Sequence, residues 1–213
     1  MGITVHVRCT ENFTPCGKGG SLLGKLTEIR WHGRGGQGAK TASQLLAEAA
    51  SAAGMYVQGF PEYGPERMGA PIQAFNRYSD QPIALHCHVT EPDVVAVLDP
   101  TLLGPAVVRG LRPTGAMLVN TSDSPAQVRA KTGLQGARVF TVDASKISVE
   151  TIGRDIPNTP MMGALIKATD FMPYEQFMTI MRQQLEDKFK SKPSVIEGNL
   201  KAIERAYQEV QSE

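Results

Sequence analysis

A run of small and polar residues near the start of the chain has the composition of a phosphate-binding turn. Residues 32–40 read His-Gly-Arg-Gly-Gly-Gln-Gly-Ala-Lys. Glycine accepts positive φ and lets the backbone approach a ligand closely. A helix that begins directly after such a turn offers unpaired N–H groups to an anion. The candidate binding residues are therefore the members of this turn, with charge added by Lys40: Gly33, Arg34, Gly35, Gly36, Gln37 and Gly38.

The residues alone leave three interpretations of the turn open. Gly33, Gly35 and Gly38 match the G-x-G-x-x-G pattern of dinucleotide sites, but such sites also need an acid at the end of the second strand. Glu62 lies near that place, although it follows Pro61 in a loop. The glycines can also serve only to pack a helix tightly on a strand. The third interpretation is a site for a phosphate-bearing ligand or for a partner subunit.

Two further groups of residues could do chemistry. His86, Cys87 and His88 resemble a metal cluster, but on a strand the two histidines share one face and Cys87 points away. Two ligands do not complete a zinc site, so we expect no metal there. In the Pro- and Gly-rich loop 61–71, Arg67 either forms a salt bridge within the loop or faces a partner subunit or a phosphate.

The elements that must position these residues follow an α/β pattern. The sequence predicts strands over residues 28–32, 56–60, 72–78, 83–88, 93–99, 116–120 and 139–142. It predicts helices over residues 39–53, 101–109, 125–132, 147–152, 161–168, 174–189 and 195–210. We expect the strands at 72–78 and 83–88 to form a hairpin. The predicted fold is a Rossmann-like, three-layer mixed sheet of about seven strands with a helical C-terminal third.

Composition narrows the class of protein. The chain has 213 residues, 41% of them hydrophobic, and a formal net charge of +1, so it gives no reason to expect a nucleic-acid or membrane partner. Three cysteines, Cys9, Cys16 and Cys87, suit a reducing compartment, and we expect a cytoplasmic protein. Iron–sulfur clusters usually need four close ligands, which the cysteines do not provide. Residues 1–25 look like an extension or docking arm before a single domain over residues 26–213.

Three segments together resemble the gamma subunits of pyruvate:ferredoxin oxidoreductases, in the 2-oxoacid:ferredoxin oxidoreductase family. The first is residues 31–40 followed by 44–50, the second is residues 60–71, and the third is residues 156–165. One departure is that Met68 precedes a single glycine, Gly69, where the family often has two. In the third segment we expect Thr159 to cap a helix with Pro160 at its first position, and Met161 and Met162 to fill a core or an interface.

The resemblance implies a division of labour among subunits. It places thiamine diphosphate with Mg²⁺ between alpha and beta subunits, and [4Fe-4S] clusters in the beta and delta subunits. The complex then converts a 2-oxoacid and coenzyme A to acyl-CoA, CO2 and reduced ferredoxin. The resemblance implies that this chain binds none of these cofactors alone, lacks a complete active site, and helps to assemble the complex and enclose coenzyme A. The turn residues and Arg67 become candidate contacts to coenzyme A or to a subunit. The alternative is a free-standing nucleotide-binding α/β oxidoreductase.

Overall fold

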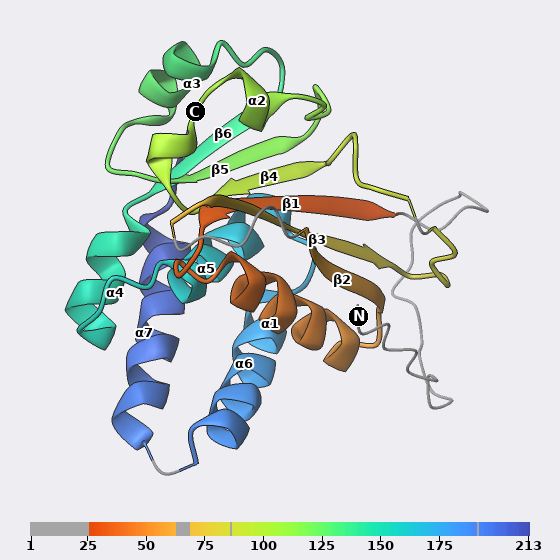
Figure 1. Cartoon of the computed structure of the whole chain (residues 1–213). Helices are drawn as coiled ribbons and strands as arrows, with labels where there is room; N and C mark the ends of the chain where they lie inside the picture. Colours follow the sequence, from red (N-terminus) through yellow and green to blue (C-terminus); the bar gives the residue numbers. More distant parts are fainter. Residues whose placement is uncertain (1–25, 63–68, 86, 191) are drawn as a thin grey trace.

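One mixed sheet of seven strands organises the computed structural model, which describes residues 26–62, 69–85, 87–190 and 192–213 (Figure 1). The order across the sheet is β2-β3-β1-β4-β5-β6-β7. Strands β1, β4, β5 and β6 are parallel, while β3 runs antiparallel to both β1 and β2, and β7 antiparallel to β6. The bounds are β1 (Thr27–Arg34), β2 (Tyr56–Glu62), β3 (Pro71–Ser79), β4 (Val94–Val97), β5 (Ala116–Asn120), β6 (Arg138–Val142) and β7 (Gln211–Ser212).

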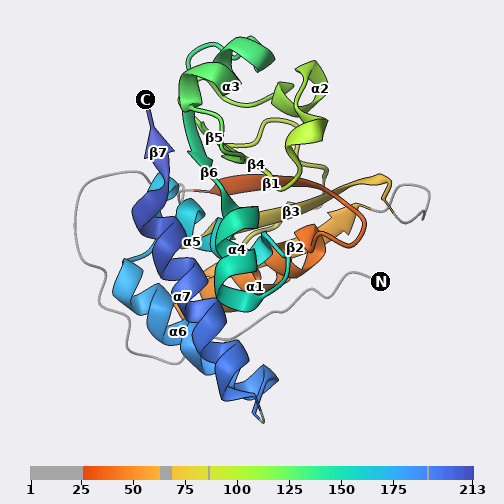
Figure 2. The same cartoon turned by 90° about the vertical axis from the view of Figure 1, so that its left-hand side faces the viewer.

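Helices cover the two faces of the sheet unequally. Helices α2 and α3 lie on one face, over β4, β5 and β6, and the other five helices cover the opposite face (Figure 2). The predicted α/β class and the helical C-terminal third are therefore confirmed. The helix bounds are α1 (Ala39–Ala52), α2 (Pro105–Val108), α3 (Pro125–Thr132), α4 (Ala144–Ile152), α5 (Asn158–Thr169), α6 (Tyr174–Lys188) and α7 (Pro193–Glu209), with a 3-10 turn η1 at Pro100–Leu102.

Local sequence explains why these helices form where they do. On α1, Ala42, Leu45, Leu46 and Ala49 recur with the 3.6-residue period and are buried against the sheet. Helix α3 begins with a capping box and ends at Gly133 in the left-handed conformation. Such ends satisfy backbone groups that a helix leaves unpaired, so the boundaries are set by a few residues.

The sheet separates two apolar cores, and β1 shows the alternation that builds them. Ile29 and Trp31 point into the larger core beneath α1, α5, α6 and α7, and both are fully buried. Arg30 and His32 point to the other face, where they are also buried. Full burial of one large aliphatic side chain contributes about 1.5–3 kcal/mol. Since β1 is buried on both faces, it is a fixed base for the turn that follows it.

The strand expected at 83–88 is absent from the described residues, and its hairpin with 72–78 was a wrong prediction. The reason is topological, because β3 already has β1 on one side and β2 on the other. The hairpin instead joins β2 to β3. Two residues of the 83–88 segment are held by side chains of the sheet: Gln58 Nε2 donates to Ile83 O at 3.3 Å, and Arg77 Nη2 donates to Cys87 O at 2.8 Å.

Smaller differences lie at the ends of the predicted elements. The helix expected at 101–109 is two short pieces, η1 and α2, and the two-residue strand β7 was not predicted. Helix α5 begins at Asn158 with Pro157 at its N-cap, so Thr159 does not cap it. Met161 and Met162 are fully buried in the larger core, as expected. Among the described residues, no helix is both long and apolar enough to span a bilayer.

Candidate functional site

The Gly-rich turn lies at the point where the connections of the sheet change direction. After β1 the chain passes through α1 on one face and moves toward β2, and after β4 it passes through η1 and α2 on the other face toward β5. Strands β1 and β4 are parallel neighbours, so the residues that follow them emerge side by side. In open α/β sheets, such a switch point at the carboxyl ends of the strands is the usual ligand site.

The turn itself uses glycine where another residue would be strained. Gly36 has φ 100° and Gly38 has φ 85°. Gly38 is the N-cap of α1, with no side-chain hydrogen bond to cap the helix and no acidic residue in its first turn. The Gln37 N–H donates to Arg34 O at 3.1 Å and closes the turn. The start of α1 therefore keeps the positive end of its dipole uncompensated by a carboxylate of its own.

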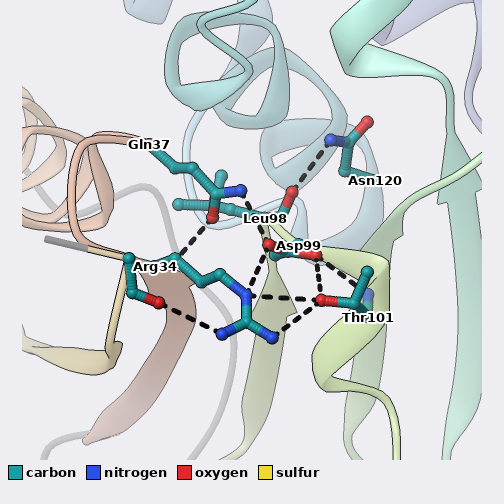
Figure 3. A network of polar contacts seen from close by, with 7 residues as sticks. Arg34, Gln37, Leu98, Asp99, Thr101 and Asn120 are labelled. Carbon is teal, nitrogen blue, oxygen red and sulfur yellow. Dashed lines mark hydrogen bonds and ion pairs between the residues drawn. The ribbon is translucent and has the colours of Figure 1, made fainter.

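Arg34 is a cation of this site and contacts two other segments of the chain, the one that follows β4 and the one that precedes β3. Its Nε lies 3.1 Å from Asp99 Oδ2, its Nη2 donates to Thr101 Oγ1 at 3.0 Å, and its Nη1 donates to Gly69 O at 3.1 Å (Figure 3). Its side chain is 36% exposed, whereas that of Asp99 is 9% exposed. A guanidinium has five N–H donors. Within the described part of the chain, two of them, one on each Nη, have no acceptor.

Asp99 follows β4 and is the acceptor at the centre of the network. Its Oδ1 accepts from Thr101 N at 2.9 Å and from Thr101 Oγ1 at 2.7 Å, and its Oδ2 accepts from Gln37 Nε2 at 2.8 Å and from Arg34 Nε. Burial acts to raise the pKa of this carboxyl, but the hydrogen bonds from Thr101 and Gln37 and the charge of Arg34 outweigh it and lower the pKa. Asp99 is therefore an anion at neutral pH.

Gln37 joins the two strand ends with a single amide group. Its Nε2 donates to Asp99, and its Oε1 accepts from the Arg34 N–H at 2.7 Å (Figure 3). These two contacts define which end of the amide faces which strand. The turn after β1 is consequently tied to the end of β4 by a side chain as well as by the sheet.

The three segments that resemble the oxidoreductase gamma subunits meet at this turn. The Gly35 N–H donates to Ala70 O at 3.1 Å, which joins the first segment to the second. The third segment arrives through Asn158 at the start of α5, whose side chain packs against Gly38. On the far side, Asn120 Nδ2 at the end of β5 donates to Leu98 O at 2.9 Å. Segments that are far apart in the sequence thus lie together at one edge of the sheet, around the Gly-rich turn.

The other residues considered as site candidates do not join this network in the described part of the chain. Arg67 and His86, like Cys9 and Cys16, lie outside the described residues. Glu62 ends β2, two strands away from β1. Cys87 is a free, exposed cysteine, and His88 is exposed. In the described portion of the chain, no three His, Cys, Asp or Glu residues gather in a way that could hold a metal ion.

Two residues of the network, Asp99 and Thr101, were not identified as site residues from the sequence. Asp99 was only the last residue of the strand predicted over residues 93–99, with no role in a site. The signal that could have identified it is its position: it directly follows the parallel strand next to β1, where the side chains of a switch point converge. Asn158 was noticed, but only beside an expected helix cap.

Arg30 and His32 form a buried pair on one face of β1, the strand that leads into the turn. Arg30 Nε donates to His32 Nε2 at 3.0 Å, and Arg30 Nη2 donates to Val107 O and Arg109 O at 2.8 and 2.7 Å. Burial and the charge of Arg30 lower the pKa of His32 to about 4. His32 is therefore neutral at physiological pH and acts as an acceptor for Arg30, next to the start of the turn.

Comparison with known proteins decides the family. The family model for pyruvate ferredoxin/flavodoxin oxidoreductase matches residues 28–209. The chain belongs to this family. The resemblance drawn from the three sequence segments is thereby confirmed. The match leaves out the first 27 residues, which include the predicted arm.

Individual members of this oxidoreductase family are similar over most of their length. A Thermotoga maritima protein named pyruvate synthase subunit PorC is 52% identical over 87% of this chain and 95% of its own. The pyruvate/ketoisovalerate oxidoreductases common subunit gamma of Pyrococcus abyssi is 42% identical over 87% of this chain and 98% of its own. The crystal structure of pyruvate oxidoreductase subunit PORC from Thermotoga maritima superposes with a TM-score of 0.78 at 49% identity, covering 88% of this chain and 98% of that one.

Proposed function

We propose that this chain is the gamma subunit of a multi-subunit pyruvate-type 2-oxoacid:ferredoxin oxidoreductase. The complex would convert a 2-oxoacid and coenzyme A to acyl-CoA, CO2 and reduced ferredoxin in the cytoplasm. The observation that carries this proposal is the 52% identity to the Thermotoga maritima pyruvate synthase subunit over nearly the whole of both chains. The role of this chain would be to assist assembly with alpha, beta and delta subunits and to help enclose coenzyme A.

The described residues do not fit the cofactors of such a complex. A [4Fe-4S] cluster needs four ligands, usually cysteines, and Cys87 is the one cysteine in the described residues. No three metal-ligating side chains gather among these residues either. We therefore assign thiamine diphosphate, Mg²⁺ and the clusters to the sister subunits and route no redox step through this chain.

Coenzyme A is a different case, because the edge of the sheet where β1 and β4 end offers hydrogen-bond donors for its phosphates. Arg34 is held in place yet keeps two N–H donors without an acceptor in the described structure. The uncapped start of α1 lies next to it. A charged hydrogen bond from Arg34 to a phosphate and the dipole of α1 would act together. Arg67 remains a candidate second cation for the same role.

The alternative function, a free-standing nucleotide-binding oxidoreductase, has weaker support. A dinucleotide site uses an acid at the end of the strand next to β1 to bind the ribose. Glu62 ends β2, and β3 lies between β2 and β1. Neighbouring strands are spaced about 4.8 Å apart, which places the β2 end about 10 Å from the β1 end. The carboxylate beside the turn is instead Asp99, and its oxygens are already occupied.

Two experiments test the proposal. Affinity purification of this chain from its native cells should recover larger, cluster-bearing chains and 2-oxoacid-dependent ferredoxin reduction, whereas an active single chain would refute the assignment. Arg34→Ala in the assembled complex tests the coenzyme A contact. Loss of one charge-assisted hydrogen bond costs roughly 1.5–3 kcal/mol, or about 10- to 150-fold in coenzyme A affinity. The apparent affinity for the 2-oxoacid should stay unchanged, and unaltered coenzyme A saturation would leave Arg34 as a structural contact.

A further inference from the structure

We infer that Asp99 is a positioning residue, which fixes Arg34 and the Gly-rich turn in the conformation that binds the phosphates of coenzyme A. The inference rests on the proposed coenzyme A contact of Arg34. It adds Asp99, which does not contact coenzyme A, to the residues on which binding depends. It also predicts whether removing the negative charge of Asp99 strengthens or weakens the binding of coenzyme A, which is an anion.

Asp99 is placed to act through its neighbours and not on a ligand. Both of its carboxylate oxygens are occupied, Oδ1 by Thr101 and Oδ2 by Arg34 and Gln37. Its side chain is 9% exposed. A carboxylate whose acceptor positions are filled from within the chain has no lone pair directed at solvent. A ligand at the edge therefore meets Arg34, and Asp99 lies behind it.

The contacts with Asp99 restrict the guanidinium of Arg34 along one of its edges. Nε faces Asp99 and Thr101, and Nη2 faces Thr101, so this side of the planar group is fixed to the end of β4. The two donors without described acceptors belong to Nη1 and Nη2. An arginine side chain loses much rotamer freedom when it is ordered. Asp99 removes that freedom before the ligand binds, which is preorganisation.

Asp99 also fixes the turn through Gln37. Because Gln37 Nε2 donates to the carboxylate, its Oε1 is directed at the Arg34 N–H. That second contact holds the backbone at the point where the chain enters two positive-φ glycines, Gly36 and Gly38. One carboxylate therefore controls both the cation and the backbone that leads into α1.

Two physical effects of Asp99 act on an anion in opposite directions. Its charge lies next to Arg34 and repels a phosphate, so electrostatics alone predicts tighter coenzyme A binding after Asp99→Asn. Its hydrogen bonds hold the site, so a positioning role predicts weaker binding. The neutral amide cannot serve all four donors, because one of its two ends is itself a donor. The sign of the change separates the two effects.

The experiment measures coenzyme A binding to the assembled complex carrying Asp99→Asn, by calorimetry and by the coenzyme A dependence of turnover. We expect about tenfold weaker binding and a similarly raised KM for coenzyme A. kcat at saturation should stay within about twofold, and hydrogen exchange over residues 33–40 should be faster. The matched control is Asp143→Asn, which also changes an aspartate after a parallel strand. Among the described residues, the Asp143 side chain caps α4 by accepting from Lys146 N and has no hydrogen bond to the turn. This variant should leave coenzyme A binding unchanged.

The double variant Arg34→Ala/Asp99→Asn identifies the route. If Asp99 acts through Arg34, the double variant should bind coenzyme A about as weakly as Arg34→Ala alone. Equal or tighter binding by Asp99→Asn, in a complex where Arg34→Ala weakens binding, overturns the positioning role and leaves the proposed contact intact. No effect of Arg34→Ala overturns both. If Asp99→Asn fails to assemble, Gln37→Met removes the bridge from Asp99 to the turn and leaves the Asp99–Arg34 contact in place. Unchanged binding and exchange in that variant overturn the role of Asp99 in fixing the turn.

Discussion

The side chain of Asn158 lies directly over Gly38, so closely that a β-carbon on Gly38 would stand 2.8 Å from Asn158 Nδ2. Gly38 also has φ 85°. This contact joins the start of α1 to the start of α5, and it gives Gly38 two reasons to be glycine, one conformational and one steric. Asn158 cannot move away freely, because it is buried and its Oδ1 accepts from Thr159 N at 2.8 Å.

Comparing two glycines of the turn separates these two reasons. Gly36 has φ 100°, and apart from its two chain neighbours no described residue has an atom within 4 Å of the place that a β-carbon would take. Gly36→Ala should therefore add only left-handed backbone strain, roughly 1–2 kcal/mol. Gly38→Ala should lose clearly more stability, about 3 kcal/mol, because steric overlap with a buried side chain is added. Urea unfolding of the full chain measures both. Equal losses would show that Asn158 yields to the methyl group.

The Arg30–His32 pair predicts a pH dependence of stability. The pKa of His32 is lowered to about 4, while an unfolded histidine titrates near 6.5, so between these values the unfolded chain binds more protons. The contribution of neutral His32 to the free energy of unfolding is complete above pH 6.5 and is lost as the pH falls toward 4. Its full size is about 3 kcal/mol. Denaturant unfolding at several pH values measures it.

The control for this prediction is His32→Gln. The glutamine Oε1 can still accept from Arg30, but the side chain does not titrate. Carboxyl groups that titrate between pH 6.5 and 4 are present in both the parent chain and the variant, so their effect cancels in the comparison. The variant should therefore lose less stability than the parent chain between pH 6.5 and 4, and parallel curves would contradict the assignment of the slope to His32.

The buried pair of Glu28 and Arg77 should be costly to break. Arg77 Nε lies 2.7 Å from Glu28 Oε1, and the arginine side chain is 1% exposed. Arg77→Met leaves a buried carboxylate without its cation, which costs about 3–5 kcal/mol. The control is Arg112→Met in the exposed pair with Asp93, worth about 1 kcal/mol or less. Thermal unfolding compares them, and similar losses would mean that water reaches Glu28.

A last prediction concerns the cofactors of the complex. The full chain expressed alone should purify without iron, acid-labile sulfide or thiamine diphosphate, because the described residues offer no set of ligands for a cluster. Elemental analysis and absorbance near the cluster bands measure this. Stoichiometric iron that disappears in a Cys9→Ser/Cys16→Ser variant would show that residues 1–25, predicted to be a docking arm, are a cofactor site.

The sequence predicted those parts of the fold that depend on local pattern. Ala116–Asn120 and Pro125–Thr132 have the predicted bounds, because an apolar run and a capping box mark their ends. The Gly-rich turn was found for a similar reason, since positive φ is visible as glycine. The family resemblance was also carried by short contiguous segments.

What the sequence did not predict depends on contacts between distant residues. The pattern at 83–88 is that of a strand, but whether it pairs is decided by β1 and β2, which occupy both edges of β3. Asp99 became part of the site only because β4 lies next to β1, and Asn158 only because α5 packs near α1. Which strands are neighbours cannot be read from local spacing alone.

The two edge strands of the described sheet differ, and this difference affects the tendency of the unassembled chain to aggregate through its sheet edges. At one side β7 covers part of β6 with two residues, and Glu213 is paired with Arg129. At the other side β2 has seven residues, and one of them is Pro61, which has no N–H to donate to a further strand. Exposed edges invite self-association, and a missing donor discourages it. Both ends of the sheet therefore carry a local obstacle to edge-to-edge aggregation.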